Sequence, residues 1–189
     1  MEVQLLKLNN KFKVLRENLK QEKFLKGPRN DLSYYIFDYN PKNEIEVRHH
    51  VKNILKDFNR LSANKIIEFD LYNMFIEFLK EQDIFEQIQE MEKSDGKEFT
   101  LNAITPFISE EMYIDKIKNE ASNYEVVFIT GVGKIYPFMR SHFILNKLHS
   151  VLGKKTLVMF YPGQYTGQDL TLFNKIVDDN YYRAFPIVD

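Results

Sequence analysis

Two short segments of this sequence are apolar at every position, and they constrain the fold more than any other feature. They are Val126–Ile129 and Leu157–Phe160. A strand that is apolar on both sides is typical of a parallel sheet whose two faces are covered. Shorter aromatic or apolar runs predict further strands at Tyr34–Asp38, Ile66–Asp70 and Ala184–Val188.

Helical patterns separate these strands along the chain. Apolar residues spaced three and four apart predict amphipathic helices, and Gly27-Pro28 ends the first of them. The predicted helices cover residues 1–26, 44–58, 74–88, 109–119 and 137–149, with a short one near 170–175. Alternating strands and helices predict an α/β fold with a mostly parallel sheet and helices on both faces. We expect an N-terminal helical arm at residues 1–29 and a single α/β domain at residues 30–189.

The strongest structural prediction concerns the two apolar segments. The spacing between Val126–Ile129 and Leu157–Phe160 suits two adjacent parallel strands joined by a helix over Pro137–His149. The turn Gly131–Gly133 should then lie at the carboxyl edge of the sheet. There it should be close to Pro162–Gly163, which follows the second strand.

Composition excludes several classes of protein. The 189 residues contain no cysteine, which rules out a disulfide scaffold and a Cys-based zinc site. No apolar run is long enough to cross a bilayer, and the first residues lack the order of a secretory signal, so we expect a cytoplasmic protein. A formal net charge of −1 argues against direct contact with nucleic acid.

The charges are nevertheless segregated. Residues 1–29 hold eight Lys/Arg against three Glu, a net charge of +5, and residues 71–98 hold eight Asp/Glu against three Lys, a net charge of −5. Such segregation can steer a protein toward charged partners. The favoured interpretation is nevertheless two solvated helix faces.

Polar residues follow several predicted strands. Asp38, Asp70, Thr130 and Tyr161 end four of them, and the carboxyl edge is where open parallel sheets bind ligands. Two aspartates there could hold a divalent cation or act as an acid/base pair. Aspartate also caps helices, and this role is the favoured interpretation. We expect no bound metal and no cofactor.

The turn after Val126–Thr130 resembles a phosphate-binding loop without matching one. Gly131 and Gly133 are too close together for a Walker A loop, and Ile135 stands where a hydroxyl should bind magnesium. Nucleotide hydrolysis is therefore not expected. Weak binding of an anion remains a candidate role for Gly131, Gly133, Lys134 and Arg140.

The C-terminal third is rich in tyrosines and amides within loops, a composition that suits contact with a partner protein. The candidate contact residues are Tyr161, Tyr165, Gln168, Tyr181, Tyr182 and Arg183. In the alternative interpretation the tyrosines complete the edge of the core. Arg183 would then pair with Asp178 or Asp179 inside the domain.

Three longer segments carry a family resemblance. They are residues 31–51 (DLSYYIFDYNPKNEIEVRHHV), residues 127–146, which contain TGVGKIYPFMRSH (130–142), and residues 159–188, which contain FYPGQYTGQ (160–168) and DDNYYRAF (178–185). With them the sequence resembles the BrxB family of bacteriophage exclusion (BREX) systems over nearly its whole length. The resemblance supplies no catalytic residue.

The resemblance implies a role in phage defence beside a PglZ-type protein, a BrxC-type ATPase and a PglX-type DNA methyltransferase. We therefore expect a non-enzymatic adaptor that docks to PglZ and helps assembly. The alternative is a degenerate nucleotide- or phosphate-binding domain with a regulatory role.

Overall fold

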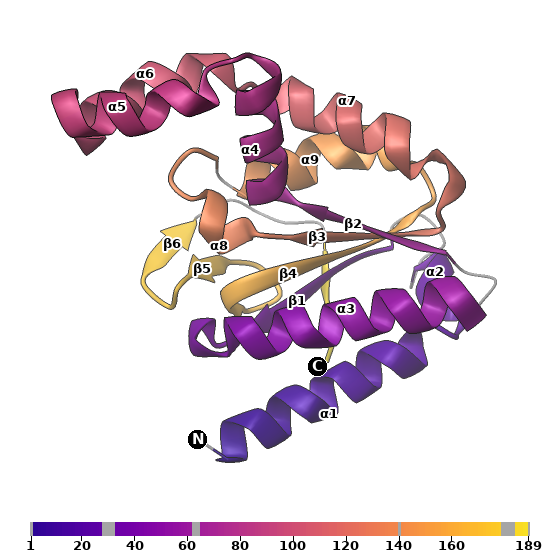
Figure 1. The fold of residues 1–189 in the computed structure, drawn as a ribbon. Helices are drawn as coiled ribbons and strands as arrows, with labels where there is room; N and C mark the ends of the chain where they lie inside the picture. The colour runs from indigo at the N-terminus through magenta and orange to yellow at the C-terminus, as the bar shows by residue number, and fades with distance from the viewer. Residues whose placement is uncertain (1, 28–32, 62–64, 140, 179–183, 189) are drawn as a thin grey trace.

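The computed structural model describes residues 2–27, 33–61, 65–139, 141–178 and 184–188, and it has a mixed α/β fold built on one sheet (Figure 1). Five parallel strands stand in the order β2-β3-β4-β1-β7. They are β1 (Tyr34–Tyr39), β2 (Ile66–Asp70), β3 (Val126–Thr130), β4 (Thr156–Tyr165) and β7 (Phe185–Pro186). A mostly parallel sheet was predicted and is confirmed.

Strands β3 and β4 are parallel neighbours, as the sequence predicts. Val127 lies opposite Leu157 in the register, and all five residues of β3 are buried. The helix between them is displaced toward the C-terminus relative to the predicted Pro137–His149. It comprises α9 (Ser141–Leu152), which is preceded by the single turn α8 (Val132–Ile135). The Pro137 expected near the first turn of this helix lies instead in the connection between α8 and α9.

The segment after β4 differs from its prediction. The short helix expected near residues 170–175 is wrong, because the chain there forms β5 (Leu170–Leu172) and β6 (Ile176–Asp178). Strand β4 continues past the parallel sheet, and its Gly163–Tyr165 portion pairs antiparallel with β5. The extended β4 supplies backbone hydrogen-bond partners for β5. The sequence pattern of a three-residue segment gives no indication of such a partner. The sheet is therefore mixed.

One cluster of buried side chains joins the sheet to the N-terminal helices α1 (Glu2–Asn18), α2 (Glu22–Lys26) and α3 (Glu44–Leu61). Figure 1 shows α1 and α3 below the sheet. Phe12 of α1 is 1% exposed, and its ring centroid lies 4.4 Å from that of Phe37 in β1. Helix α1 therefore shares the core of the sheet, whereas an arm would be expected to leave it.

A second cluster joins the sheet to α4 (Leu71–Glu81), α7 (Glu110–Glu120), α8 and α9. Figure 1 shows α4, α7 and α9 above the sheet. Alternate residues of β1 serve the two clusters: Tyr34 and Ile36 belong to this one, and Tyr35 and Phe37 to the other. This division follows from the two-residue period of a strand.

Helices α5 (Phe85–Asp95) and α6 (Lys97–Ile104) form a hairpin that projects from the top of the molecule (Figure 1). The remaining elements are single 3-10 turns, η1 (Pro41–Asn43), η2 (Thr105–Phe107) and η3 (Ala121–Asn123). None of the helices in the described part of the chain is both long and apolar enough to span a membrane.

Candidate functional site

The two aspartates at the carboxyl edge do not lie together. Asp38 is the penultimate residue of β1 and Asp70 the last residue of β2, and strands β3 and β4 stand between them. Three strand spacings separate them by roughly 14 Å. One cation cannot bridge that distance. The two aspartates are therefore not placed to share a metal ion or to act as an acid/base pair. Within the described residues, no group of three His, Cys, Asp or Glu side chains is placed to hold a metal ion.

Asp70 caps the helix that follows it, which was the favoured interpretation. Its Oδ1 accepts hydrogen bonds from the backbone N–H groups of Tyr72 (3.0 Å) and Asn73 (3.1 Å). Its Oδ2 forms an ion pair with the ammonium group of Lys134. Both carboxylate oxygens are thus used inside the domain. This leaves Asp70 a structural role at the start of α4.

The turn from Gly131 to Lys134 is filled by that same carboxylate. Gly131 has a φ of +74°, and a Cβ atom there would stand 2.3 Å from Oδ1 of Asp70. Lys134 pairs with Asp70, and its Nζ lies 5.6 Å from the ring centroid of Tyr72. An added anion would have to compete with this built-in negative charge. Arg140, the fourth candidate, lies outside the described residues.

The predicted proximity of Gly131–Gly133 to Pro162–Gly163 is confirmed, although Gly133 lies in α8 and Pro162 in β4. A Cβ atom at Gly133 would stand 2.8 Å from Cγ of Pro162 and 2.8 Å from Cε1 of Phe173. The glycine therefore lets α8 pack directly on β4 at Pro162. Close packing, without any ligand, is a sufficient reason for glycine at this position.

Glu68 is a partly buried carboxyl next to this turn. Thr130 donates its hydroxyl hydrogen to Oε1 of Glu68 at 2.7 Å. Burial raises the pKa of Glu68, and the nearby charge of Asp70 adds to the increase, while the Thr130 hydrogen bond and Lys134 oppose it. The side chain was not singled out from the sequence, because its position in the middle of β2 gives no signal of chemistry.

The tyrosines of the C-terminal third are mostly internal. Tyr161 is 1% exposed, and Tyr165 is 9% exposed. The Tyr165 hydroxyl donates to the carbonyl of Ala184 at 2.8 Å and lies 3.1 Å from the carbonyl of Gly167. These two rings complete the core edge, as the alternative interpretation had it. Gln168 is exposed.

The other expected contact residues, Tyr181, Tyr182 and Arg183, lie outside the described residues. So does Asp179, one of the two acidic partners considered for Arg183, and the side chain of Asp178 is likewise not described. The partner-contact role of this segment therefore stays a prediction.

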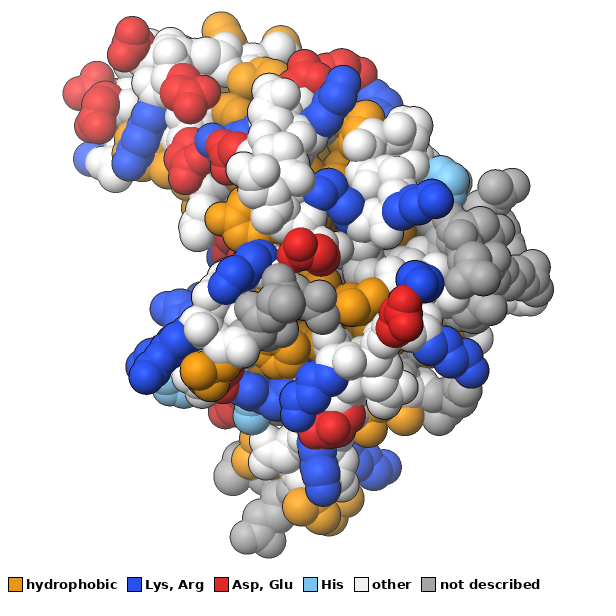
Figure 2. Space-filling view, turned by 90° about the vertical axis from the view of Figure 1, so that its right-hand side faces the viewer, with side chains coloured by type: hydrophobic (Ala, Val, Ile, Leu, Met, Phe, Trp, Pro, Cys, Tyr) orange, Lys and Arg blue, Asp and Glu red, His pale blue; other side chains and the backbone are white. Residues whose placement is uncertain are grey.

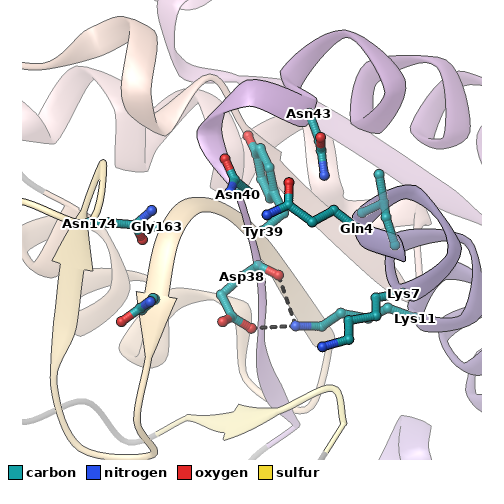
Figure 3. Close-up of a pocket in the computed structure, with 11 residues that line it drawn as sticks. Gln4, Lys7, Lys11, Asp38, Tyr39, Asn40, Asn43, Gly163 and Asn174 are labelled. Carbon is teal, nitrogen blue, oxygen red and sulfur yellow. Dashed lines mark hydrogen bonds and ion pairs between the residues drawn. The ribbon is translucent and has the colours of Figure 1, made fainter. Parts of the chain in front are cut away.

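A polar cleft of about 480 Å³ opens at the carboxyl ends of β1 and β4 (Figure 3). Helix α1, the end of β1, the turn η1, strand β4 and the β5–β6 turn supply its walls. The lining residues are Gln4, Lys7, Leu8, Lys11, Asp38, Tyr39, Asn40, Asn43, Gly163, Gln164 and Asn174. Sequence reasoning missed this cleft because α1 was expected to be an arm. The one available signal was the four-residue spacing of Lys7 and Lys11, which places both on one helix face.

Asp38 anchors the floor of this cleft. Lys11 donates to the backbone carbonyl of Asp38 at 2.8 Å and forms an ion pair with its Oδ1. The backbone N–H of Tyr165 donates to Oδ2 at 3.4 Å. Next to Asp38, the hydroxyl of Tyr39 donates a hydrogen bond to Glu44 at 2.5 Å. Burial is the main cause that raises the pKa of Tyr39, and the negative charge of Glu44 raises it further. The hydroxyl of Tyr39 therefore stays protonated.

The α5–α6 hairpin presents an acidic and apolar surface. Between Phe85 and Ile104 five acidic side chains stand against two lysines, a net charge of −3. Phe99 is 55% exposed, and Phe107, just beyond α6, is 46% exposed. Figure 2 shows acidic and apolar side chains together over the upper part of the molecule, at the height where Figure 1 places α5, α6 and α7.

Known proteins are similar to this chain over most of its length. The family model described as "BREX protein BrxB" matches residues 67–187. A BREX protein BrxB of Bacillus cereus (strain H3081.97) is 41% identical over 168 residues, which cover 87% of this chain and 88% of the relative. A BREX protein BrxB of Escherichia coli O9:H4 (strain HS) is 30% identical over 178 residues, 92% of this chain and 88% of the relative. No solved structure matches. This chain therefore belongs to the BrxB family of BREX proteins.

Proposed function

We propose that this chain is a non-enzymatic docking component of a BREX phage-defence assembly, and that it binds a PglZ-type protein through the α5–α6 hairpin. Membership of the BrxB family supports a role in a BREX system. One observation carries the docking surface: none of the eleven residues of α5 is buried.

A short helix without a buried residue needs a further apolar surface to pack against. Isolated helices shorter than about 12–15 residues are marginal in water, and most helical stability in proteins comes from packing an apolar face. In α5, Phe85 and Ile88 pack against the core but stay partly exposed, and Met91 is also half-buried. Phe99 of α6 and Phe107 of η2 add exposed rings to the same projecting part of the chain. A partner that covers these side chains would supply the missing burial.

Charge defines the partner further. The hairpin carries a net charge of −3, so a basic surface around an apolar pocket is its complement. Complementary charge speeds association and selects the partner, whereas buried aromatic anchors supply most of the binding energy. The docking face of the PglZ-type protein is therefore expected to carry Lys or Arg around a pocket that accepts Phe99.

The carboxyl edge of the sheet supports the non-enzymatic part of the proposal. Asp70 is engaged by Lys134 and by the backbone of α4, and Thr130 bonds Glu68. Catalytic acids, bases and nucleophiles need a free face toward a substrate. Phosphate binding at Gly131–Lys134, the alternative function, gains nothing from this geometry because Lys134 is already paired.

Size-exclusion chromatography and calorimetry with a purified PglZ-type protein test the proposal. We expect co-elution at micromolar concentration. Phe99→Ser should weaken binding by on the order of thirtyfold, because an aromatic anchor contributes about 2 kcal/mol or more. Leu6→Ser is the matched control, since Leu6 is 64% exposed on α1, away from the hairpin. Added salt should slow association.

Two results would contradict different parts of this proposal. Separate elution of the two wild-type proteins would remove PglZ as the partner. Co-elution that survives Phe99→Ser and Phe107→Ser unchanged would move the docking surface away from the hairpin. The proposal also places the protein in the cytoplasm, where contacts with a BrxC-type ATPase or a PglX-type methyltransferase would follow assembly.

A further inference from the structure

The polar cleft stands at the position where open α/β sheets bind ligands. Helix α3, which follows β1, packs in one core cluster, whereas α4 after β2 and α8 with α9 after β3 pack in the other. The connections after β1 and β3 therefore leave the sheet toward opposite sides, and β4 stands between these two strands. Such a reversal opens a crevice at the carboxyl ends of the strands. The cleft of about 480 Å³ is in the size range of small-molecule sites.

Two lysines of α1 supply the positive charge of this cleft. Lys7 and Lys11 are one helical turn apart, and Figure 3 shows both side chains running from α1 toward Asp38. Lys11 uses two of its three ammonium donors on Asp38, which leaves one N–H. Lys7 forms no ion pair with any described side chain, so all its donors remain. With Asp38 balancing Lys11, the lining carries one net positive charge.

The rest of the lining is built from amides. Gln4, Asn40, Asn43, Gln164 and Asn174 contribute carboxamide side chains to the walls. Asn40 accepts from the backbone N–H of Lys42 at 3.0 Å through its oxygen, and its NH₂ group has no partner among the described residues. Carboxamides both donate and accept, which suits hydroxyl groups. Leu8 and Tyr39 are themselves buried, so the ring of Tyr39 offers no exposed face to a ligand.

We propose that this cleft binds a small sugar phosphate, with its phosphate on Lys7 and Lys11 and its hydroxyls on the amides. A phosphate offers three acceptor oxygens to the four available ammonium N–H groups, whereas a carboxylate offers two oxygens. A nucleotide base fits less well, because the lining provides no exposed aromatic face for stacking. This site is separate from the α5–α6 hairpin, and it does not depend on the docking function.

Calorimetry on the full chain with ribose 5-phosphate tests the assignment, with ribose and inorganic phosphate as separate probes. Ribose 5-phosphate should bind most tightly and ribose least. Lys7→Gln should weaken binding about tenfold, because a charged hydrogen bond contributes about 1.5 kcal/mol or more. Lys13→Gln is the matched control: Lys13 is exposed on the same helix but outside the cleft. Asn43→Leu should weaken ribose 5-phosphate without changing inorganic phosphate.

Three outcomes would overturn the assignment. The first is an absence of binding at millimolar ribose 5-phosphate in a chain whose thermal unfolding is normal. The second is an equal loss in the Lys7 and Lys13 variants, which would mean general attraction to a basic helix. The third is equal affinity for inorganic phosphate and ribose 5-phosphate, unchanged by Asn43→Leu, which would remove the sugar from the ligand. Since Lys7 and Lys13 are both exposed, neither variant should unfold the protein.

Discussion

Replacing Phe12 with alanine tests whether α1 belongs to the core of the domain. The ring is 1% exposed. Its centroid lies 4.4 Å from that of Phe37, 4.3 Å from that of His50 and 6.2 Å from that of Phe160. Truncation removes these contacts and leaves a cavity between α1, α3 and the sheet.

The expected cost follows from this burial. Phe→Ala substitutions in cores cost about 3–5 kcal/mol, the sum of lost transfer free energy and the cavity left behind. In a protein of 150–250 residues each kcal/mol lowers the melting temperature by roughly 2–4 °C. The melting temperature should therefore fall by roughly 6–20 °C. Leu6→Ala, at a 64% exposed position of the same helix, should change the free energy of unfolding by less than about 0.5 kcal/mol.

Urea unfolding followed by circular dichroism measures both variants against the wild type. The midpoint should fall for Phe12→Ala with little change in the slope, since the same surface is exposed on unfolding. A loss below about 1 kcal/mol for Phe12→Ala would refute the reasoning. Helix α1 would then be a separable arm, and it would not form a fixed wall of the cleft.

Two further predictions concern the carboxyl edge. Gly131→Ala should destabilise the fold by clearly more than Gly153→Ala in thermal unfolding: both glycines have positive φ, but only at Gly131 would a Cβ strike Asp70. Equal losses would mean that Asp70 moves freely. For Glu68, burial raises the folded-state pKa, so its contribution to stability is present below the unfolded pKa and is lost as pH rises through the folded pKa. Glu68→Gln can still accept the hydrogen bond from Thr130. Its melting temperature should exceed that of the wild type by an amount that grows as pH rises from about 4 to about 8. A difference that stays constant with pH would contradict this.

The sequence by itself determined the apolar strands and their immediate partners. Val126–Ile129 and Leu157–Phe160 are apolar on both sides, which is typical of strands in a parallel sheet whose two faces are covered. A connection of this length between them then required adjacent parallel pairing, which the register confirms. Gly133 beside Pro162 follows from the same geometry, because Gly133 comes soon after β3 and Pro162 lies where the parallel pairing of β4 with β1 ends. These features depend on local pattern and short connections.

Only the tertiary structure decided which distant groups meet. Strand order places β3 and β4 between Asp38 and Asp70, so two residues that look alike in sequence serve different helices and different lysines. Lys11 reaches Asp38 across 27 residues, and Lys134 reaches Asp70 across 64. The β5–β6 hairpin likewise depends on the extra length of β4. Each of these contacts is set by packing between elements far apart in the chain, where a local sequence pattern carries no information about its partner.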